Sequence, residues 1–349
     1  MPTKPAELNI PPELAKAFEV KELPVAASIA EAPVEPQAAP KKRKGKAVKT
    51  VSAAAGSEGI AGPGELSFAI PKRRPPFDPV WVGEKIWMDV TWLSTKAGEF
   101  LLEVQPFKVM NGRKVYDLKG TARTSDLFSL IYKAEDFVQS FVDYEGWFPY
   151  KFILHGDETR HVRDNLELFD HGAKKQYVHV HDYRVQQNEL HEEKGVKDLT
   201  PLSQDSLSAL YYVRTQHMEV GKVIKFPMTT NGSQWETNLT VMNREEVNTK
   251  MGYMNAFKTK LETRFKGVLQ QQGDAFMWFS DDERKYPLRF EAKVRIGWVA
   301  GIAKKIEPGV PELGAEKKPR PGSPADDAVS AIQKSGKRRT WFRDLIRKN

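Results

Sequence analysis

Cysteine is absent from the 349-residue sequence. Disulfides, and sites in which cysteine thiolates hold zinc or an iron–sulfur cluster, are therefore excluded. Apolar runs also stay short of the ~20 residues that a membrane-spanning helix needs. The opening stretch, MPTKPAELNIPPELAKAFEV, shows no apolar leader core. We therefore expect either a cytoplasmic protein or a true start that lies further upstream.

Motifs for common kinds of catalysis are missing as well. Neither the G-x-S-x-G elbow of a serine hydrolase nor a phosphate-binding G-x-x-x-x-G-K-[ST] or G-x-G-x-x-G loop occurs. The acidic cluster Ser280–Arg284 stands between two apolar runs, where Asp and Ser favour a tight turn over acid–base catalysis. We identify no catalytic residue and expect no cofactor. Enzyme activity stays an open question, with a non-enzymatic role favoured.

Excess positive charge is confined to the two ends of the chain. Residues 80–307 contain 32 basic and 32 acidic side chains, whereas the whole chain contains 54 and 46. The net charge of +8 therefore lies outside the middle segment. We predict a disordered Ala/Pro/Lys-rich segment at 1–79, a folded domain at 80–307, a flexible linker at 308–336 and a short basic amphipathic helix at 337–349.

The basic tails suggest contact with an anionic surface or a protein of the cell envelope. KKRKGK at 41–46 and KRR at 72–74 are typical either of such a contact or of a solvated linker. In the last stretch, apolar residues one helical turn apart stand among arginines; these are Trp341, Phe342, Leu345, Ile346, Arg338 and Arg339. Such a helix suits a membrane surface or a partner's groove, although it could also dock on its own domain or fray. Charge on tails rather than on a folded face makes nucleic acid an unlikely partner.

Alternating apolar residues predict strands through the middle of the chain. Ile86, Met88, Val90 and Trp92 alternate with more polar positions, which is the period of a strand. Asn-Gly pairs at 111–112 and 231–232 each separate two such runs and are strong hairpin signals. About a dozen runs of this kind follow with short connections. We therefore predict a mainly β domain with a large antiparallel curved sheet or barrel.

Two segments show helical spacing instead. In SDLFSLIYKAED, Leu127, Leu130 and Ile131 share one helical face after Ser125 or Asp126 as a cap. In SQDSLSALYYVRT, four residues follow the i, i+3, i+4, i+7 pattern, namely Leu207, Leu210, Tyr211 and Arg214. We expect two short helices, the second of them crossing between two halves of the sheet.

Histidine and tryptophan supply the remaining candidate site residues. His179 and His181 would point to one side of a strand, which suits two metal ligands, but no third ligand is evident and a solvated face is favoured. A wide curved sheet can leave its interior partly unfilled, and tryptophans could line a groove for an apolar or lipid-like ligand. Ordinary core filling is the other interpretation. The weak candidates are Trp87, Trp92, Trp278 and Trp298.

Three long blocks of the middle segment resemble the bacterial DUF3108 family. They are VGEKIWMDVTWLSTKAGEFLLEV, then TARTSDLFSLIYKAEDFVQSFVDYEGWFPYKF, and finally DSLSALYYVRT paired with AFMWFSDDERKYPLRFEAKVRIGWVAGI. The resemblance implies a large antiparallel β fold, in proteins that are mostly exported to the cell envelope and periplasm. It implies no reaction. The long N-terminal segment, the basic C-terminal tail and the missing leader depart from the family pattern.

Three functional hypotheses follow from the sequence. The first is a non-enzymatic envelope protein whose β domain binds an apolar ligand or an envelope partner, with basic tails near a membrane. The second is a scaffolding module with a filled core. The third and weakest is a hydrolase with an unrecognised site.

Overall fold

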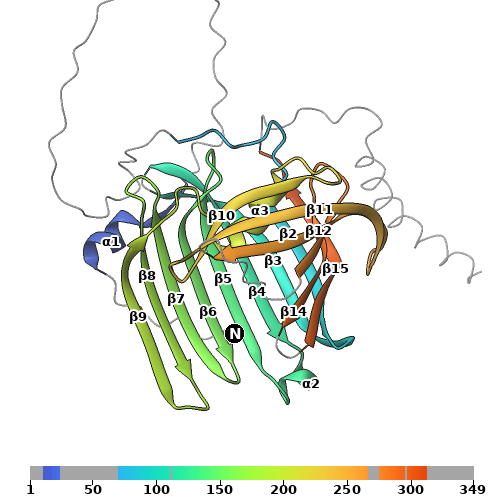
Figure 1. Cartoon of the computed structure of the whole chain (residues 1–349), viewed down its shortest axis with the longest axis horizontal. Coiled ribbons are helices and arrows are strands. Elements are labelled where there is room, and N and C mark those ends of the chain that lie inside the picture. The colour runs from blue at the N-terminus through green and yellow to red at the C-terminus, as the bar shows by residue number, and fades with distance from the viewer. Residues whose placement is uncertain (1–10, 24–69, 111, 266–274, 295–296, 313–349) are drawn as a thin grey trace, which may run out of the picture.

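A computed structural model describes residues 11–23, 70–110, 112–265, 275–294 and 297–312 (Figure 1). The described residues form fifteen strands and three helices. None of the described helices has the length and apolar character required to cross a membrane. The predicted linker, for nearly all of its length, and the predicted basic C-terminal helix lie outside the described residues.

The elements follow one another along the chain with short connections. The helices are α1 (Pro12–Ala17), α2 (Asp126–Ser129) and α3 (Ser206–Arg214). The strands are β1 (Val20–Glu22), β2 (Val82–Trp92), β3 (Thr95–Met110), β4 (Arg113–Thr124), β5 (Ala134–Asp143), β6 (Pro149–Glu158), β7 (His161–Asp170), β8 (Lys175–Arg184), β9 (Glu189–Asp198), β10 (Val223–Thr230), β11 (Ser233–Thr249), β12 (Gly252–Phe265), β13 (Ala275–Ser280), β14 (Pro287–Val294) and β15 (Gly297–Val310).

All strands belong to one antiparallel sheet, as predicted. Its order is β10-β11-β12-β13-β14-β15-β2-β3-β4-β5-β6-β7-β8-β9, with β1 added beside β3. The first strand of the main series, β2, pairs with the last, β15, in the middle of the sheet. The sheet is not closed into a barrel, because β9 and β10 form its two edges. Figure 1 shows it strongly curved, with β10 to β12 crossing in front of the other strands.

Hairpin turns occur at both places where the sequence predicts them. Asn231 and Gly232 both have positive φ, at 49° and 76°, and connect Thr230 to Ser233. Gly112 has φ 73° and lies inside the turn that pairs Met110 with Arg113. Two consecutive positive φ angles match the twist of a two-residue hairpin loop.

Helix α3 belongs to the connection between the two edge strands, β9 and β10, and lies on the concave side of the sheet. It packs against β4, β5 and β10. Its N-cap Asp205 accepts hydrogen bonds from Leu207 N and Ser208 N, and Ser208 Oγ accepts one in return from Asp205 N. Ser140 Oγ of β5 donates to Asp205 Oδ2 at 2.5 Å. The start of the helix is therefore fixed to the sheet as well as capped.

A buried ion cluster fixes the other end of α3. Arg214 donates to both carboxylate oxygens of Glu84 on β2, at 2.6 and 2.8 Å. Arg284 donates to the same carboxylate at 2.6 Å, and both arginines also donate to the carbonyl of Pro79. All three side chains are buried. Buried charges are tolerated when they are paired and their remaining donors are satisfied, as they largely are here. We call this group the Glu84 cluster.

Two hydrophobic clusters form the core. The larger one joins the concave face of the sheet to α3 and includes Trp147, Tyr116 and Tyr211. The smaller one joins α1 to β4 through β8, where Leu14 and Phe18 are buried.

The structure corrects three expectations about the elements. Residues of α1 and β1 are folded, although they fall in the segment 1–79 that we expected to be disordered; the i, i+4 pair Leu14 and Phe18 supplies the buried contact. The first predicted helix is one turn long, because β5 already begins at Ala134, and the shared face of Leu127, Leu130 and Ile131 is exposed. Strand β9 was not expected, because it is an edge strand whose exposed side chains show no apolar alternation.

The Glu84 cluster leads to a prediction about stability. Replacing Arg214 with Met leaves part of a buried carboxylate uncompensated, so we expect Arg214→Met to lower the unfolding free energy by about 3–5 kcal/mol. Arg123→Met is the matched control. Arg123 is exposed and lies 3.6 Å from Glu135, so its loss should change stability by about 1 kcal/mol or less. Urea unfolding followed by tryptophan fluorescence measures both. Equal effects of the two substitutions would contradict the anchoring role.

Candidate functional site

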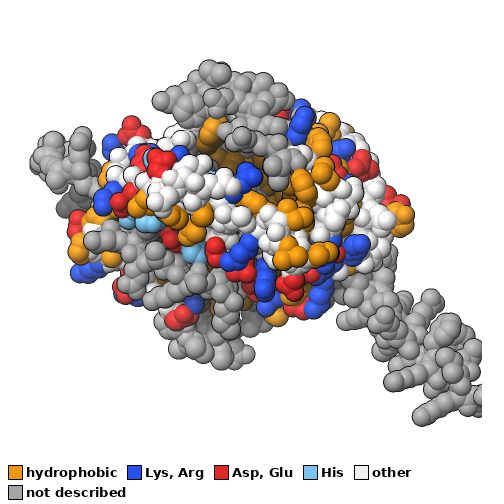
Figure 2. Space-filling view, turned by 90° about the horizontal axis from the view of Figure 1, so that it is seen from below, with side chains coloured by type: hydrophobic (Ala, Val, Ile, Leu, Met, Phe, Trp, Pro, Cys, Tyr) orange, Lys and Arg blue, Asp and Glu red, His pale blue; other side chains and the backbone are white. Residues whose placement is uncertain are grey.

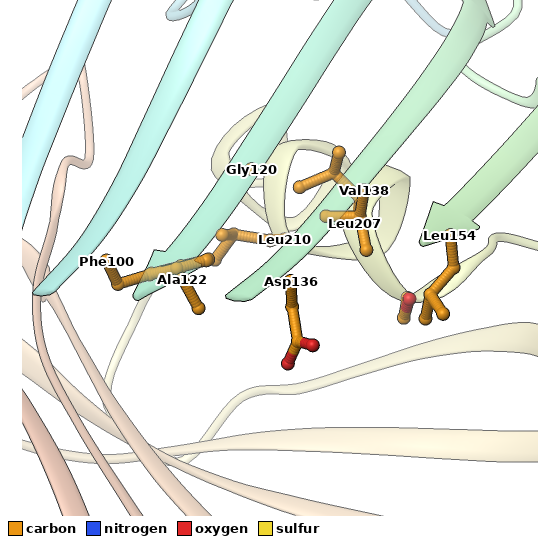
Figure 3. Close-up of a pocket in the computed structure, with 9 residues that line it drawn as sticks. Phe100, Gly120, Ala122, Asp136, Val138, Leu154, Leu207 and Leu210 are labelled. Carbon is orange, nitrogen blue, oxygen red and sulfur yellow. The ribbon is translucent and has the colours of Figure 1, made fainter. Parts of the chain in front are cut away.

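An apolar pocket of about 270 Å³ lies between α3 and the concave face of the sheet (Figure 3). Its described lining comes from β3, β4, β5, β6 and α3, and consists of Phe100, Gly120, Ala122, Asp136, Val138, Leu154, Ser206, Leu207 and Leu210. The volume is near the lower end of the ~300–1,000 Å³ that small-molecule sites usually have. One small molecule or one short apolar chain would fill it.

Small residues on β4 create this space. Gly120 and Ala122 both face α3, because alternate residues of a strand share a face. A Cβ atom at Gly120 would lie 2.8 Å from Val138 Cγ2 and 3.5 Å from the Phe100 ring. Larger side chains at these two positions would occupy the gap between sheet and helix. The pocket therefore depends on the identity of two residues in one strand.

The charged side chain among the described lining residues is Asp136. The register places Asp136 opposite Gly156, and a Cβ atom there would lie 2.9 Å from Asp136 Oδ1. Asp136 Oδ1 is buried and has no hydrogen-bond partner. Burial, reinforced by the nearby Glu158 carboxylate, raises the pKa of Asp136 to about 6, while Arg163 and His155 act in the opposite direction. This carboxyl group is an unused hydrogen-bond acceptor at the wall of an apolar space.

Further unpaired polar atoms lie on β7, which pairs with the lining strand β6. Arg163, Asn165 and Glu167 alternate on one face of this strand. Each has a buried atom without a partner, namely Arg163 Nε, Asn165 Oδ1 and Glu167 Oε2. Burial raises the pKa of Glu167 to about 7, although the backbone N–H of Asn231 donates to it. An unsatisfied buried polar group costs about 1–3 kcal/mol, so this row of atoms suits bound water or polar groups of a ligand.

The four candidate tryptophans are not gathered at this pocket. Trp87 lies under the ammonium group of Lys305, 4.5 Å from its ring centre. Trp92 makes an edge contact with Phe128 at 5.7 Å. Trp278 is buried and donates to Glu245, and Trp298 is 42% exposed at the start of β15. None of them is among the described residues that line the pocket.

The candidate histidines occupy alternate positions on β8. His179 is buried, and its Nε2 lies 2.9 Å from Glu192 Oε1. His181 pairs across the sheet with Asp164 and Glu192. Within the part of the chain that the structure describes, no three His, Cys, Asp or Glu side chains come together as possible metal ligands. Trp341, Phe342, Leu345, Ile346, Arg338 and Arg339 lie outside the described residues.

Sequence reasoning missed the pocket residues and the Glu84 cluster. The alternation predicts the strands that contain Gly120, Ala122 and Asp136. Only the register of the strands shows that these residues lie next to one another on the same face of the sheet. Arg214 was noted for its helical spacing, whereas its partner lies 130 positions away. The SDDER segment is a turn, as predicted, in which Asp282 accepts from the N–H groups of Arg284 and Lys285. A carboxylate within an otherwise apolar strand face, as at Asp136, is the one signal that could have indicated the site.

Fold and site together define an open, strongly curved antiparallel sheet that wraps around one helix and leaves an apolar pocket beside it. The sequence profile of the family described as a protein of unknown function, DUF3108, matches residues 88–301. The chain belongs to this family, which confirms the resemblance found in the sequence. No curated protein matches the chain.

Several solved structures are similar in part. A β-barrel-like protein of the domain of unknown function DUF1849 from Brucella abortus is 11% identical, with a TM-score of 0.43; the match covers 65% of this chain and 98% of that one. A Bacteroides fragilis protein with a YmcC-like fold, proposed to be exported, is 12% identical, with a TM-score of 0.26 and coverages of 66% and 98%. A Parabacteroides distasonis protein, proposed to be a lipoprotein, is 8% identical, with a TM-score of 0.25 and coverages of 67% and 99%.

Asp136 leads to a prediction about pH. Its folded-state pKa of about 6 lies above its ordinary value of 3.8, so the folded protein holds this proton more tightly than the unfolded chain. Its contribution to stability is therefore present at low pH and falls as the pH rises from about 4 to about 6. We expect Asp136→Asn to be more stable than the natural protein at pH 8, by about 1 kcal/mol after allowance for partial exposure, and nearly equal to it at pH 4.

Thermal unfolding at both pH values tests this prediction. Asp157→Asn is the control, because Asp157 belongs to the adjacent strand and pairs with Lys133 at 2.6 Å. The control should not gain stability at pH 8. A stability difference between Asp136→Asn and the natural protein that stays the same at pH 4 and pH 8 would exclude the raised pKa. Glu167 and Asp205, whose burial also raises their pKa values to about 7 and about 6, are unchanged in this comparison.

Proposed function

We propose that this protein is a non-enzymatic binding protein whose β domain holds an apolar, lipid-like ligand between α3 and the sheet. The observation that carries the proposal is the pocket itself, with apolar walls from four strands and one helix and a single carboxyl group among its described lining. Ligand sites commonly combine apolar walls with a few polar groups that fix orientation. The described arrangement has this character.

The polar atoms indicate the chemistry of the ligand. Asp136 Oδ1 is an acceptor without a partner, so a hydroxyl or amine of the ligand would satisfy it. A carboxylate or phosphate head group would be repelled there by the ionised Asp136 and by Glu158. The ligand that fits best has a small apolar body and a hydrogen-bond donor at one end.

The pocket is held open by elements that are fixed at both ends. Asp205 ties the start of α3 to β5, and the Glu84 cluster ties its end to β2. A helix anchored in this way cannot collapse onto Gly120 and Ala122 without breaking buried polar contacts. A preformed pocket reduces the ordering cost of binding. This rigidity favours a binding role over a scaffold whose core is simply filled.

The location in the cell envelope is part of the same proposal and rests on the family resemblance. KKRKGK at 41–46 and the basic C-terminal stretch would hold the protein near an anionic membrane surface. Arg73 and Arg74 of the KRR segment pack on the folded domain instead, where Arg74 pairs with Asp78 at 2.9 Å. Fractionation of the native host, followed by detection of the protein, distinguishes envelope from cytoplasm. Recovery in the cytoplasm alone would remove this part of the proposal and leave the pocket unaffected.

A neutral fluorescent amine tests ligand binding. N-phenyl-1-naphthylamine is apolar, carries one N–H donor and becomes bright in apolar surroundings. We expect saturable binding to the full chain, and at least a tenfold weaker affinity for Ala122→Leu, because the added side chain fills the pocket. Thr121→Leu is the matched control, because the adjacent residue of a strand points to the opposite face. The control should bind like the natural protein.

The outcomes separate the two leading hypotheses. Binding that is lost in Ala122→Leu and kept in Thr121→Leu places the probe in this pocket. Absence of saturable binding to the natural protein, or equal binding to both variants, would contradict the ligand proposal and favour the scaffolding module. Circular dichroism of both variants shows whether each is folded.

A further inference from the structure

Five large apolar side chains are exposed together at one end of the sheet. They are Leu93 (60% exposed), Leu127 (80%), Leu130 (83%), Ile131 (73%) and Trp298 (42%). We call these five residues the turn rim. Leu93 belongs to the β2–β3 turn, the next three to the connection between β4 and β5 that contains α2, and Trp298 to the start of β15.

The β2–β3 turn, the β4–β5 connection and the start of β15 are neighbours in space. Their strands are consecutive in the sheet, in the order β14-β15-β2-β3-β4-β5. Leu93 N of the β2–β3 turn donates to Trp298 O of β15 at 3.4 Å, and Ser125 N of the β4–β5 connection donates to Ala97 O of β3 at 2.8 Å. Hydrogen bonds therefore join each of these two connections to the neighbouring strand. The Phe128 ring adds its contact with Trp92. The turn rim is therefore one surface, at the end of the molecule where Figure 1 shows α2.

Local structure holds these side chains outward. Ser125 caps α2 by accepting from Phe128 N, and the single helical turn orients Leu127 and Leu130 away from the sheet. Single exposed apolar residues are normal, whereas a contiguous patch marks an interaction surface. Burying a leucine or isoleucine side chain is worth about 1.5–3 kcal/mol. Burial of Leu127, Leu130 and Ile131 against a partner would therefore be strongly favourable.

The charges around the turn rim fit an anionic surface. In three ion pairs at this end the basic partner is the more exposed one; the pairs are Lys96 with Asp89, Arg123 with Glu135 and Lys133 with Asp157. Lys293, which pairs across the sheet with Trp298, is also exposed. The exposed carboxylates here are Asp126 and Glu99, and Glu99 is bound by Lys96 and Lys304. Figure 2, seen from below, shows hydrophobic side chains next to basic side chains on this face, with acidic side chains among them.

The shape of the surface favours a membrane over a protein partner. The apolar groups stand on two separate connections and on the end of a strand rather than on one flat strand face. Tryptophan with lysine and arginine nearby is the composition that anchors proteins at the boundary between lipid head groups and acyl chains. Leucines on protruding turns can enter a fluid layer without a complementary pocket in a partner.

We propose that the turn rim inserts into the head-group region of a bilayer that contains anionic phospholipid. The residues Leu127, Leu130 and Ile131 supply the apolar contact, and the outward-facing lysines and arginines contact the head groups. This surface is separate from the pocket lining and does not depend on ligand binding. Ala122 and Asp136 of the pocket lie two residues from the ends of β4 and β5 that face the rim, so a membrane-derived ligand would have a short path.

A single labelled cysteine provides the direct test, because the natural chain contains none. The full chain carrying Leu130→Cys is labelled with the environment-sensitive dye NBD and mixed with vesicles of phosphatidylglycerol and phosphatidylcholine. We expect a blue shift of the emission and quenching by a lipid-embedded nitroxide. Val310→Cys is the matched control, because Val310 is 71% exposed and lies at the opposite end of β15. Its label should not respond.

A second measurement isolates the rim from any binding by the basic segments. Vesicle sedimentation at 0.5 M NaCl screens exposed charges, whereas apolar insertion persists. Under these conditions we expect Leu127→Ser combined with Leu130→Ser and Ile131→Ser to reduce vesicle partitioning at least tenfold. The control combines Val220→Ser, Tyr253→Ser and Val310→Ser, which remove exposed apolar groups outside the rim. The control should partition like the natural chain.

Three outcomes would overturn the proposal. One is an NBD label at Leu130 that does not respond to vesicles. Another is equal partitioning of the rim and control variants. The third is a dimer in the absence of lipid that the three rim substitutions abolish, which would assign the surface to a second copy of the chain.

Discussion

One buried carboxylate, Glu84, holds together parts of the chain that are far apart in sequence. It accepts hydrogen bonds from Arg214 at the end of α3 and from Arg284 in the β13–β14 turn. Arg284 also donates to the carbonyl of Pro308 near the end of β15. The same small region therefore fixes the start of β2, the helix and the last strand. Without it, the helix that shapes the pocket would be fixed to the sheet by polar contacts at its N-terminal end only.

Much of this fold could be predicted from the sequence, because its strands obey simple rules. The alternation through Ile86 and Met88 gave the face of β2, and Asn231-Gly232 gave a hairpin with the backbone angles that such a turn requires. Helix α3 followed from apolar spacing. Local signals of this kind describe where a chain bends and which side it buries. They do not state which strands become neighbours, so the pairing of β2 with β15 required the structure.

The candidate site could be predicted far less well. Tryptophans are the natural guess for an apolar ligand site, yet the described pocket is shaped by the smallest residues, Gly120 and Ala122, whose contribution is the space that they leave. A single sequence does not show which of its glycines and alanines leave such a space. The rim illustrates the opposite error, because Leu127 and Leu130 have the spacing of a buried helix face. Strand β5 begins too soon for the helix to lengthen and fold back, so these residues point outward.

The pairing of β2 with β15 also determines how the molecule can be placed between two surfaces. Val82 is opposite Val310, so the series of strands from β2 to β15 begins and ends at adjacent points, and the turn rim lies at the far ends of these two strands. Eleven residues of β2 at ~3.3 Å per residue separate the two ends by about 35 Å. The described backbone at Val82 and Val310 is thus held at a fixed distance from whatever the rim contacts. The β domain then acts as a rigid spacer between these two ends, with its length set by the strands.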